Sequence, residues 1–263
     1  MRDQLSRLEI GGGRVQEAPD GWSLTIPAGR SGYADAQIDD TAGRRRAEFL
    51  HRPPTHLSLE ARTSGLPLVG TLGFGFWNDP FPSFGGAAGS SRLWPAGPRA
   101  LWFFGRWPPS DLPFAPGARG IGWCAACLDA PDLPGLAVAG LAGAATLAML
   151  LPPLRRAATR FFYRHTPSRQ EDLQGEQDTW RRYEIDWNED CAEFFVDGLM
   201  ILRTASPPKG PMGLVIWIDN QWATFSMERG LRFGVSPSDH PTWMEIRNLR
   251  LNGQLVEGPS RAS

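Results

Sequence analysis

Two short runs of the chain combine aromatic rings with side chains that form directional hydrogen bonds. Their members are Trp77, Asn78, Asp79, Trp217, Asp219, Asn220 and Trp222. Indole faces pack against the C–H-rich faces of sugars, and they suit flat or aliphatic small molecules equally well. Amide and carboxylate groups beside them can fix the hydroxyl groups of a ligand. These residue types therefore predict binding of a small apolar or glycan ligand.

The same runs contain groups that could act as an acid, a base or an anion clamp. Asp79 and Asp219 from these runs, together with Arg99 from another segment, would serve these roles in an enzyme that acts on a small substrate. However, the two carboxylates come from distant segments, and no spacing rule brings them together. An enzymatic function stays open, and no catalytic residue is predicted.

A third candidate is the thiol pair Cys124 and Cys127 in the run WCAAC, which has the spacing of a redox motif. That motif requires a helix directly after it, so that the helix amino terminus stabilises the first thiolate. Pro131 and Pro134 follow soon after, which favours two small buried residues instead. The histidines show no ligand spacing with Cys191, so no metal and no other cofactor are predicted.

Short alternating runs bounded by glycine and proline must position these side chains. The runs predicted as strands are 21–29, 55–63, 71–79, 100–107, 181–189, 191–205, 213–219, 230–236 and 243–253. Alternation places Trp217 and Asp219 on one face of their strand, with Ile216 and Ile218 on the other. Asp-Gly at 197–198 predicts a tight hairpin, and the last strand needs a bulge near Asn248 to keep one apolar face.

The middle of the chain departs from this pattern. Residues 133–151 carry no charge, and as a helix they would span roughly 28 Å. An arginine-rich aromatic stretch follows, so the segment from Leu133 to Arg169 has the composition of a peripheral membrane contact. A single crossing would separate strands that belong to one sandwich. Three interpretations remain: a helix docked on the protein's own apolar surface, an interfacial or re-entrant membrane segment, and an oligomer contact.

Composition limits the function classes further. The 263 residues include 11 Trp, 14 Phe, 30 Gly and 24 Pro, which favours many short strands joined by tight turns. The net charge of -1 provides no basic field for nucleic acid, so nucleic acid is not an expected partner. Charges within the first nine residues argue against a secretory signal, and three cysteines suit a reducing compartment. We therefore expect a cytoplasmic protein, with membrane association as one interpretation of its middle segment.

Three runs in the second half share a family pattern. They are TWRRYEIDWNEDCAEFFVDG (179–198), PKGPMGLVIWIDNQWA (208–223) and WMEIRNLRL (243–251). Together they resemble the carboxy-terminal half of the family 16 glycoside hydrolases, in the concanavalin A-like lectin and glucanase superfamily. The resemblance implies an all-β, concanavalin A-like jelly roll of two curved antiparallel sheets, with a glycan on the concave face. We expect one such domain over residues 1–263, with residues 131–170 as an inserted apolar and arginine-rich helical segment.

The family's catalytic motif, ExDxxE, has no counterpart here. The corresponding region, from Trp94 to Trp107, reads WPAGPRALWFFGRW and contains no Asp or Glu. Retaining hydrolysis needs two carboxyl groups roughly 5 to 5.5 Å apart. We therefore predict no activity as a family 16 hydrolase, and we add Trp102 and Phe104 from this strand to the residues lining the cleft.

Three hypotheses follow for the cleft. The first is a non-hydrolytic module that binds an apolar or amphipathic ligand, such as a lipid, a glycolipid or a small molecule, with the inserted helix closing over it. The second is a lectin-like carbohydrate binder. The third is an enzyme of another class that uses the same cleft.

Overall fold

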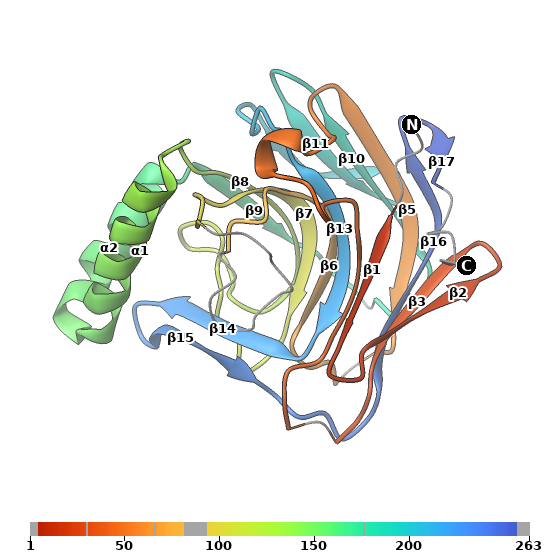
Figure 1. The fold of residues 1–263 in the computed structure, drawn as a ribbon, viewed down its shortest axis with the longest axis horizontal. Coiled ribbons are helices and arrows are strands. Elements are labelled where there is room, and N and C mark those ends of the chain that lie inside the picture. Colours follow the sequence, from red (N-terminus) through yellow and green to blue (C-terminus); the bar gives the residue numbers. More distant parts are fainter. Residues whose placement is uncertain (1–4, 30, 66, 82–93, 176, 257–263) are drawn as a thin grey trace.

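The computed structural model describes residues 5–29, 31–65, 67–81, 94–175 and 177–256. Two large sheets lie face to face, and a pair of helices stands on one side of them (Figure 1). Neighbouring strands within both sheets run antiparallel. The predicted all-β jelly-roll sandwich is confirmed.

The seven-stranded sheet curves toward the side on which the helices lie, and we call it the concave sheet (Figure 1). In spatial order its strands are β1 (Ser6–Ile10), β4 (Asp35–Asp39), β13 (Gly213–Asp219), β6 (Thr71–Trp77), β7 (Arg99–Arg106), β8 (Gly122–Asp129) and β9 (Ser168–Asp172). Four of these, β1, β4, β8 and β9, were not predicted as strands. Their runs are short and polar, or rich in small residues, so their strand signal is weak.

The eight-stranded sheet forms the other layer, and we call it the outer sheet. Its strands are β12 (Leu199–Thr204), β11 (Ala192–Val196), β10 (Arg181–Trp187), β5 (Thr55–Thr63), β16 (Thr242–Leu251), β3 (Gly21–Ile26) and β2 (Arg14–Ala18), with β17 (Gln254–Leu255) paired to β16. A short 3-10 helix, η1 (Arg46–Glu48), lies in the connection between β4 and β5. The outer sheet therefore collects strands from both ends of the sequence.

Aromatic rings from both sheets fill the space between the layers. The ring of Phe74 in β6 lies 5.0 Å from that of Tyr183 in β10, and Phe103 in β7 lies 5.6 Å from Phe194 in β11. Each strand contributes every second side chain to this core, because side chains alternate across a strand. The remaining side chains of the concave sheet are thereby directed to its open face.

Two local predictions about the outer sheet are confirmed. Asp197 and Gly198 join β11 to β12 with φ angles of 51° and 79°, as a tight turn between twisted strands requires. The register of β16 against β5 shifts between Arg247 and Arg250, and Asn248 has a φ of 54°. The shift is the bulge that keeps Met244, Ile246 and Leu249 in the core.

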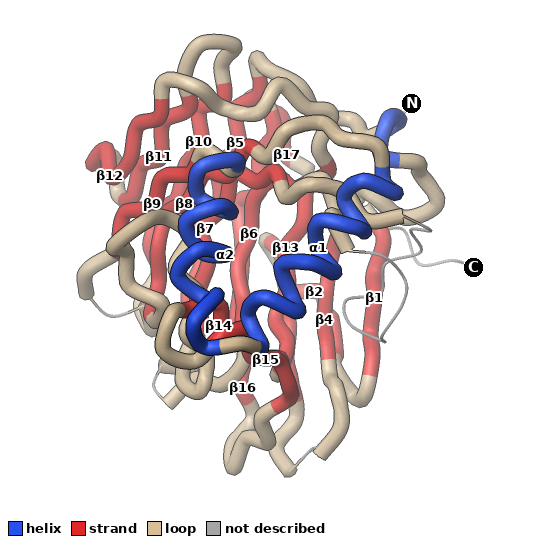
Figure 2. Tube along the Cα trace, turned by 90° about the vertical axis from the view of Figure 1, so that its left-hand side faces the viewer, coloured by secondary structure: helices blue, strands red, loops and turns tan. Residues whose placement is uncertain are grey.

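A two-stranded ribbon and a helical hairpin complete the described chain. The ribbon consists of β14 (Gln221–Ser226) and β15 (Gly230–Val235), and it leaves the concave sheet directly after β13. Helices α1 (Gly135–Leu150) and α2 (Pro152–His165) lie in front of the concave sheet and form a V (Figure 2). Both fall within the predicted segment 131–170. Among the described residues, neither helix is long and apolar enough to cross a membrane.

The two helices lie against the ribbon, and α2 also contacts the 107–121 loop. The ring of Phe162 in α2 lies 5.0 Å from that of Phe225 in β14, and the Tyr163 hydroxyl donates to the carbonyl oxygen of Pro113. Met149 is the one buried residue of α1. An isolated two-stranded ribbon is marginally stable in water, so these contacts support both elements.

Candidate ligand-binding site on the concave face

Strand register aligns the open-face side chains of the concave sheet in rows. One row runs through Leu8, Gln37, Trp217, Gly73, Phe104, Cys124 and Asp172, which lie opposite one another on successive strands. Trp217 and Phe104 lie in the middle of this row, on either side of Gly73, and Gln37 and Asp172 lie toward its two ends. The predicted alternation in β13, with Trp217 and Asp219 on the open face, is confirmed by the burial of Ile216 and Ile218 in the core.

Five aromatic side chains form the floor of the concave face, and we call them the aromatic floor: Trp77, Trp102, Phe104, Phe114 and Trp217. The ring of Trp102 lies 5.7 Å from that of Trp217 and 5.0 Å from that of Phe104. All these pairs are tilted or edge-on, which suits the ring quadrupoles. Four of the five come from strands, and Phe114 comes from a loop. Trp77, Phe104, Phe114 and Trp217 are only 6–8% exposed, so the floor is a rigid, largely apolar layer that is mostly covered.

Two glycines of β6 make room for the floor. An added Cβ at Gly73 would lie 2.8 Å from the Trp217 ring and 2.3 Å from the carbonyl oxygen of Phe103. Gly75 has a φ of 145°, and an added Cβ there would lie 2.9 Å from the Cβ of Trp102. A side chain at either position would displace an aromatic ring. The run TLGFGFW therefore has glycine at alternate positions, which leaves room on the open face of β6 for the rings of Trp217 and Trp102.

We expect Gly73→Ala to lower the free energy of unfolding by roughly 1–3 kcal/mol, because the methyl group overpacks the floor. Chemical denaturation measures this change. Gly32→Ala is the control for loss of a glycine, since neither Gly32 nor Gly73 has a positive φ and an added Cβ at Gly32 meets nothing within 4 Å. An unchanged midpoint and near-ultraviolet circular dichroism spectrum in Gly73→Ala would show that the ring of Trp217 does not need this space.

One buried arginine fixes the loop that carries Phe114. Arg106, at the end of β7, is 0% exposed, and its guanidinium donates to the carbonyl oxygens of Leu112, Arg119 and Gly122. Its Nη1 also lies 2.9 Å from the Sγ of Cys124. The guanidinium carbon lies 5.1 Å from the centre of the Phe114 ring. Arg106 therefore holds the 107–121 loop against the aromatic floor.

The indole N–H groups of the floor differ in their hydrogen bonding. The Nε1 atoms of Trp77 and Trp102 are buried, and no acceptor for them lies among the described residues. By contrast, the Nε1 of Trp217 donates to the Thr71 hydroxyl at 3.1 Å. A buried donor without an acceptor costs about 1–3 kcal/mol, so an oxygen acceptor at either nitrogen would stabilise this layer.

An acidic end adjoins the aromatic floor along β4 and β13. Asp35 and Asp219 lie directly opposite each other on these strands and are 1% and 6% exposed. The Oδ1 atom of Asp219 accepts hydrogen bonds from the Thr71 amide and hydroxyl and from the Gln221 amide. Asp39, two rows away, accepts from Gln37 and from the Thr41 hydroxyl. The carboxylates of Asp219 and Asp39 therefore accept hydrogen bonds that order the strand ends.

Burial changes the acidity of this pair. It raises the pKa of the Asp219 carboxyl to about 7, and the hydrogen bonds from Gln221 and Thr71 oppose the shift. Burial also raises the pKa of Asp35 well above its usual range, with repulsion from Asp219 and Asp39 adding to the effect and a hydrogen bond from Tyr33 opposing it. The pair therefore holds a proton more readily than exposed carboxylates do.

Asn78, Asp79 and Arg99 lie at the opposite end of the sheet from Asp219. Thr71 pairs with Asp219, whereas Trp77 pairs with Gly213, so Trp77 is separated from Asp219 by roughly 20 Å along the strands, and Asp79 follows the end of β6 beyond Trp77. The Asn78 side chain accepts from the Arg99 amide and donates to the Gly97 carbonyl, and Arg99 donates to the Ala130 carbonyl. These hydrogen bonds order the end of the β6–β7 pair. Asp79 and Asp219 do not form one catalytic site.

Asn220 and Trp222 also have neighbours within the fold. The Asn220 side chain accepts from the Ala34 amide and donates to the Gly32 carbonyl, which holds the chain entering β4. Trp222 lies in the ribbon, where an added Cβ at Gly234 would come within 2.8 Å of its ring. Of the predicted set, the sheet brings together Trp77, Trp102, Phe104 and Trp217.

The two thiols of WCAAC lie on opposite faces of β8. Cys124 belongs to the layer of the aromatic floor, whereas Cys127 belongs to the core between the sheets. Burial raises the pKa of Cys124 to about 11 and that of Cys127 to about 12. Three residues of extended strand separate their Cα atoms by about 10 Å, beyond the reach of a disulfide. The thiols are small packing residues, and no cluster of metal-binding side chains occurs in the described ranges.

Several residues of the site were missed from the sequence. They are Asp35, Gln37 and Asp39 of β4, Arg106 at the end of β7, and Leu112 and Phe114 of the following loop. The alternation in DAQID, with Ala36 and Ile38 in the core, is the signal that predicts β4. No local pattern identifies Arg106 or Phe114, because a loop folded back on the sheet brings them together.

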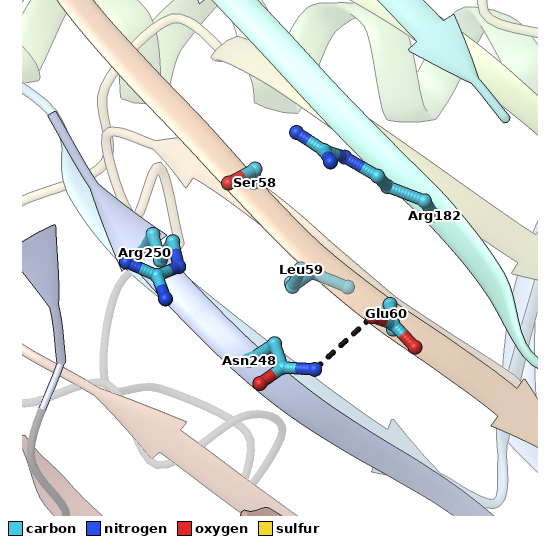
Figure 3. A pocket seen from close by; sticks show the side chains of 6 residues that line it. All are labelled: Ser58, Leu59, Glu60, Arg182, Asn248 and Arg250. Atoms are coloured by element: carbon cyan, nitrogen blue, oxygen red, sulfur yellow. Dashed lines mark hydrogen bonds between the residues drawn. The ribbon is translucent and has the colours of Figure 1, made fainter. Parts of the chain in front are cut away.

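A separate depression lies on the far face of the outer sheet, with a volume of about 260 Å³. Figure 3 shows its lining residues, which are Ser58, Leu59, Glu60, Arg182, Asn248 and Arg250. The bulge in β16 turns Asn248 toward Glu60, and its Nδ2 donates to the Glu60 carboxylate at 3.0 Å. Arg247 also pairs with Glu60, which lowers the pKa of that carboxyl. The depression is a solvated charge network and is distinct from the concave face.

These features define the class of the molecule: a jelly-roll sandwich with an aromatic floor on its concave sheet. No family model and no curated protein matches the chain. Solved structures that resemble it include a legume lectin-like domain from Entamoeba histolytica, with 10% identity over 95% of this chain and 90% of that chain and a TM-score of 0.49. A family 16 endo-glucanase from Bacteroides ovatus has 10% identity over 95% of both chains and a TM-score of 0.49. A sialidase has 7% identity over 95% of this chain and a TM-score of 0.45, and the chain covers 17% of that protein's length.

Proposed function

We propose that the protein binds an amphipathic ligand, such as a glycolipid or a glycoside, on the aromatic floor without hydrolysing it by the family 16 mechanism. The observation that carries this proposal is the pair of buried indole N–H groups, at Trp77 and Trp102, within a surface of aromatic rings. The rings suit the apolar part of such a ligand. The indole N–H groups suit its hydroxyl or carbonyl oxygens.

The face of β7 supports the non-hydrolytic part of the proposal. Its open-face side chains are Ala100, Trp102 and Phe104, in the region where the resemblance would place the catalytic acids. Asp35 and Asp219, an acidic pair on this face, are buried, and Asp219 is hydrogen-bonded to the start of β6. A hydrolytic pair needs access to the substrate and to water.

A lectin-like function is the second candidate, and the same donors favour it, because sugar hydroxyls accept hydrogen bonds from indole N–H groups. The two candidates differ in whether an apolar chain is required. The affinities for an alkyl glycoside and for a glucose oligosaccharide with the same head group distinguish the two candidates. Tighter binding of the alkyl glycoside would support the amphipathic ligand, and equal or weaker binding would support the lectin-like function.

Tryptophan substitutions locate the site. We expect Trp102→Ala to weaken binding of the alkyl glycoside about 30-fold, since a central tryptophan contributes about 2 kcal/mol or more to binding. Isothermal titration measures the affinity. Trp243→Ala is the matched control, because Trp243 lies in β16 on the outer sheet beside Arg62. Equal affinity in Trp102→Ala and Trp243→Ala would place the ligand elsewhere.

Native mass spectrometry of protein purified without detergent identifies a ligand that is already bound. An adduct with a hydrocarbon chain supports the proposal directly. An adduct that Trp102→Ala and Trp217→Ala retain in full would contradict binding at the aromatic floor.

A further inference from the structure

The helical hairpin exposes large apolar side chains where it turns. Leu147 and Leu150 at the end of α1 are 66% and 60% exposed, and Leu151 and Leu154 follow them. Met227, in the turn between β14 and β15, is also exposed. We call these five residues the apolar tip. Exposed apolar patches of this kind mark surfaces that bind another molecule or a membrane.

Hydrogen bonds join the two turns that form the apolar tip. The Arg155 Nε atom donates to the carbonyl oxygen of Met149 at 2.9 Å, and its Nη1 atom donates to the carbonyl oxygen of Glu228 at 2.9 Å. An added Cβ at Gly230 would lie 2.7 Å from the Met149 carbonyl oxygen, so the two turns are in close contact. The tip is therefore one surface, although its residues come from two separate segments.

A basic stripe runs along α2 from the apolar tip. Arg156, Arg160 and Arg164 recur every four residues, so they lie on one side of the helix, and all three are exposed. No carboxylate among the described residues forms an ion pair with them, and residues 133–169 contain no Asp or Glu. Phe161, on the adjoining part of the helix, is exposed as well. Arginines beside exposed Leu and Phe are typical of helices that lie in a membrane interface.

We propose that the apolar tip and the basic stripe of α2 dock the protein on a membrane surface rich in anionic phospholipid. The leucines and Met227 would enter the region between head groups and acyl chains, and the three arginines would contact phosphate and carboxylate groups of the lipids. This inference does not rest on the ligand proposed for the aromatic floor. Its residues lie on the helices and the ribbon tip, not on the floor.

A second copy of the chain is a less suitable occupant of this surface. A twofold interface places the same patch of both subunits together, so each basic stripe would approach the other. The hairpin provides no acid to compensate these charges. Anionic lipid supplies the opposite charge together with an apolar layer, which matches both parts of the surface.

Vesicle flotation of the full chain tests the proposal. We expect binding to vesicles of equimolar phosphatidylcholine and phosphatidylserine, and much weaker binding to phosphatidylcholine alone. The triple variant Arg156→Gln, Arg160→Gln and Arg164→Gln should bind on the order of 100-fold more weakly, because each arginine near an anionic surface contributes about 1 kcal/mol. The double variant Leu147→Ser and Leu150→Ser should also lose binding, with its fold intact because both side chains are exposed.

The control has the same change of net charge elsewhere on the surface. Arg14, Arg182 and Arg203 are exposed on strands of the outer sheet. Changing all three to Gln should leave flotation unaltered. Loss of flotation in the control, or equal binding of wild-type protein to both vesicle types, would overturn the charge argument. Absence of binding to the anionic vesicles would overturn the proposal. Sedimentation velocity tests for a second copy. If the wild-type protein is a dimer and the double variant Leu147→Ser and Leu150→Ser is a monomer, the surface binds a second copy instead.

Discussion

Replacing Arg106 by Met is expected to lower the free energy of unfolding by roughly 3 kcal/mol or more, since each hydrogen bond from a charged group contributes about 1.5–3 kcal/mol. The guanidinium donates to the carbonyl oxygens of Leu112, Arg119 and Gly122, and the Arg119 oxygen also accepts from the Gln170 side chain. Met fills much of the volume but donates no hydrogen bond. Equilibrium denaturation in urea measures the change.

The same variant should loosen the 107–121 loop and move Phe114 away from Trp102 and Phe104. Near-ultraviolet circular dichroism reports the loss of these ring contacts, which are 5.6 and 4.9 Å between centres in the wild-type protein. The stability of Arg106→Lys should be close to that of Arg106→Met, because a single ammonium group lacks the planar fork of donors with which the guanidinium reaches three carbonyls. Arg250→Met, at an exposed position of the outer sheet, is the control. A variant Arg106→Met as stable as Arg250→Met would show that the loop is held by its apolar contacts alone.

The second large effect is a change in how stability depends on pH. The folded protein raises the pKa of Asp219 to about 7, whereas an unfolded aspartate titrates near 3.9. The folded state therefore binds the proton more tightly than the unfolded state does. Its contribution to stability is fully present below about pH 4 and is lost as the pH rises through about 7.

Asp219→Asn removes this titration and keeps an oxygen for the hydrogen bonds from Thr71 and Gln221. The stability of the variant relative to wild type should rise between about pH 4 and pH 7 and then level off, by about 4 kcal/mol at most. Urea denaturation across this range measures the difference. Asp20→Asn, at an exposed turn, controls for the loss of one carboxylate. A difference between Asp219→Asn and wild type that stays constant with pH would contradict the raised pKa.

The acidity of Asp35 depends on Asp219 as well. Repulsion from Asp219 contributes to the raised pKa of Asp35, so Asp219→Asn should make Asp35 a stronger acid. The cross-strand register alone brings these two carboxyl groups together, since 184 residues separate them in the chain. Their proximity could not be predicted from spacing, because β4 was not predicted as a strand.

The sequence by itself determined the parts of the protein that depend on local pattern. Alternating apolar residues in 55–63, 71–79 and 213–219 predicted β5, β6 and β13, because side chains alternate across a strand. Asp197 and Gly198 predicted a turn that needs positive φ, and the misplaced Asn248 predicted a bulge. The lack of charge in 133–151, together with the prolines at its two ends, predicted helix α1.

Only the tertiary structure decided which of these elements share a surface. Trp77, Trp102 and Trp217 meet on one floor because β6, with Gly73 and Gly75, lies between β7 and β13 in the sheet. Asp79 and Asp219 lie at opposite ends for the same reason: antiparallel pairing sets the end of β6 against the start of β13. The contacts of Arg106 depend on how the following loop folds back on the sheet, and the apolar tip depends on contacts between segments that are remote in sequence. Such contacts follow from how the whole chain packs, and no short stretch of residues encodes them.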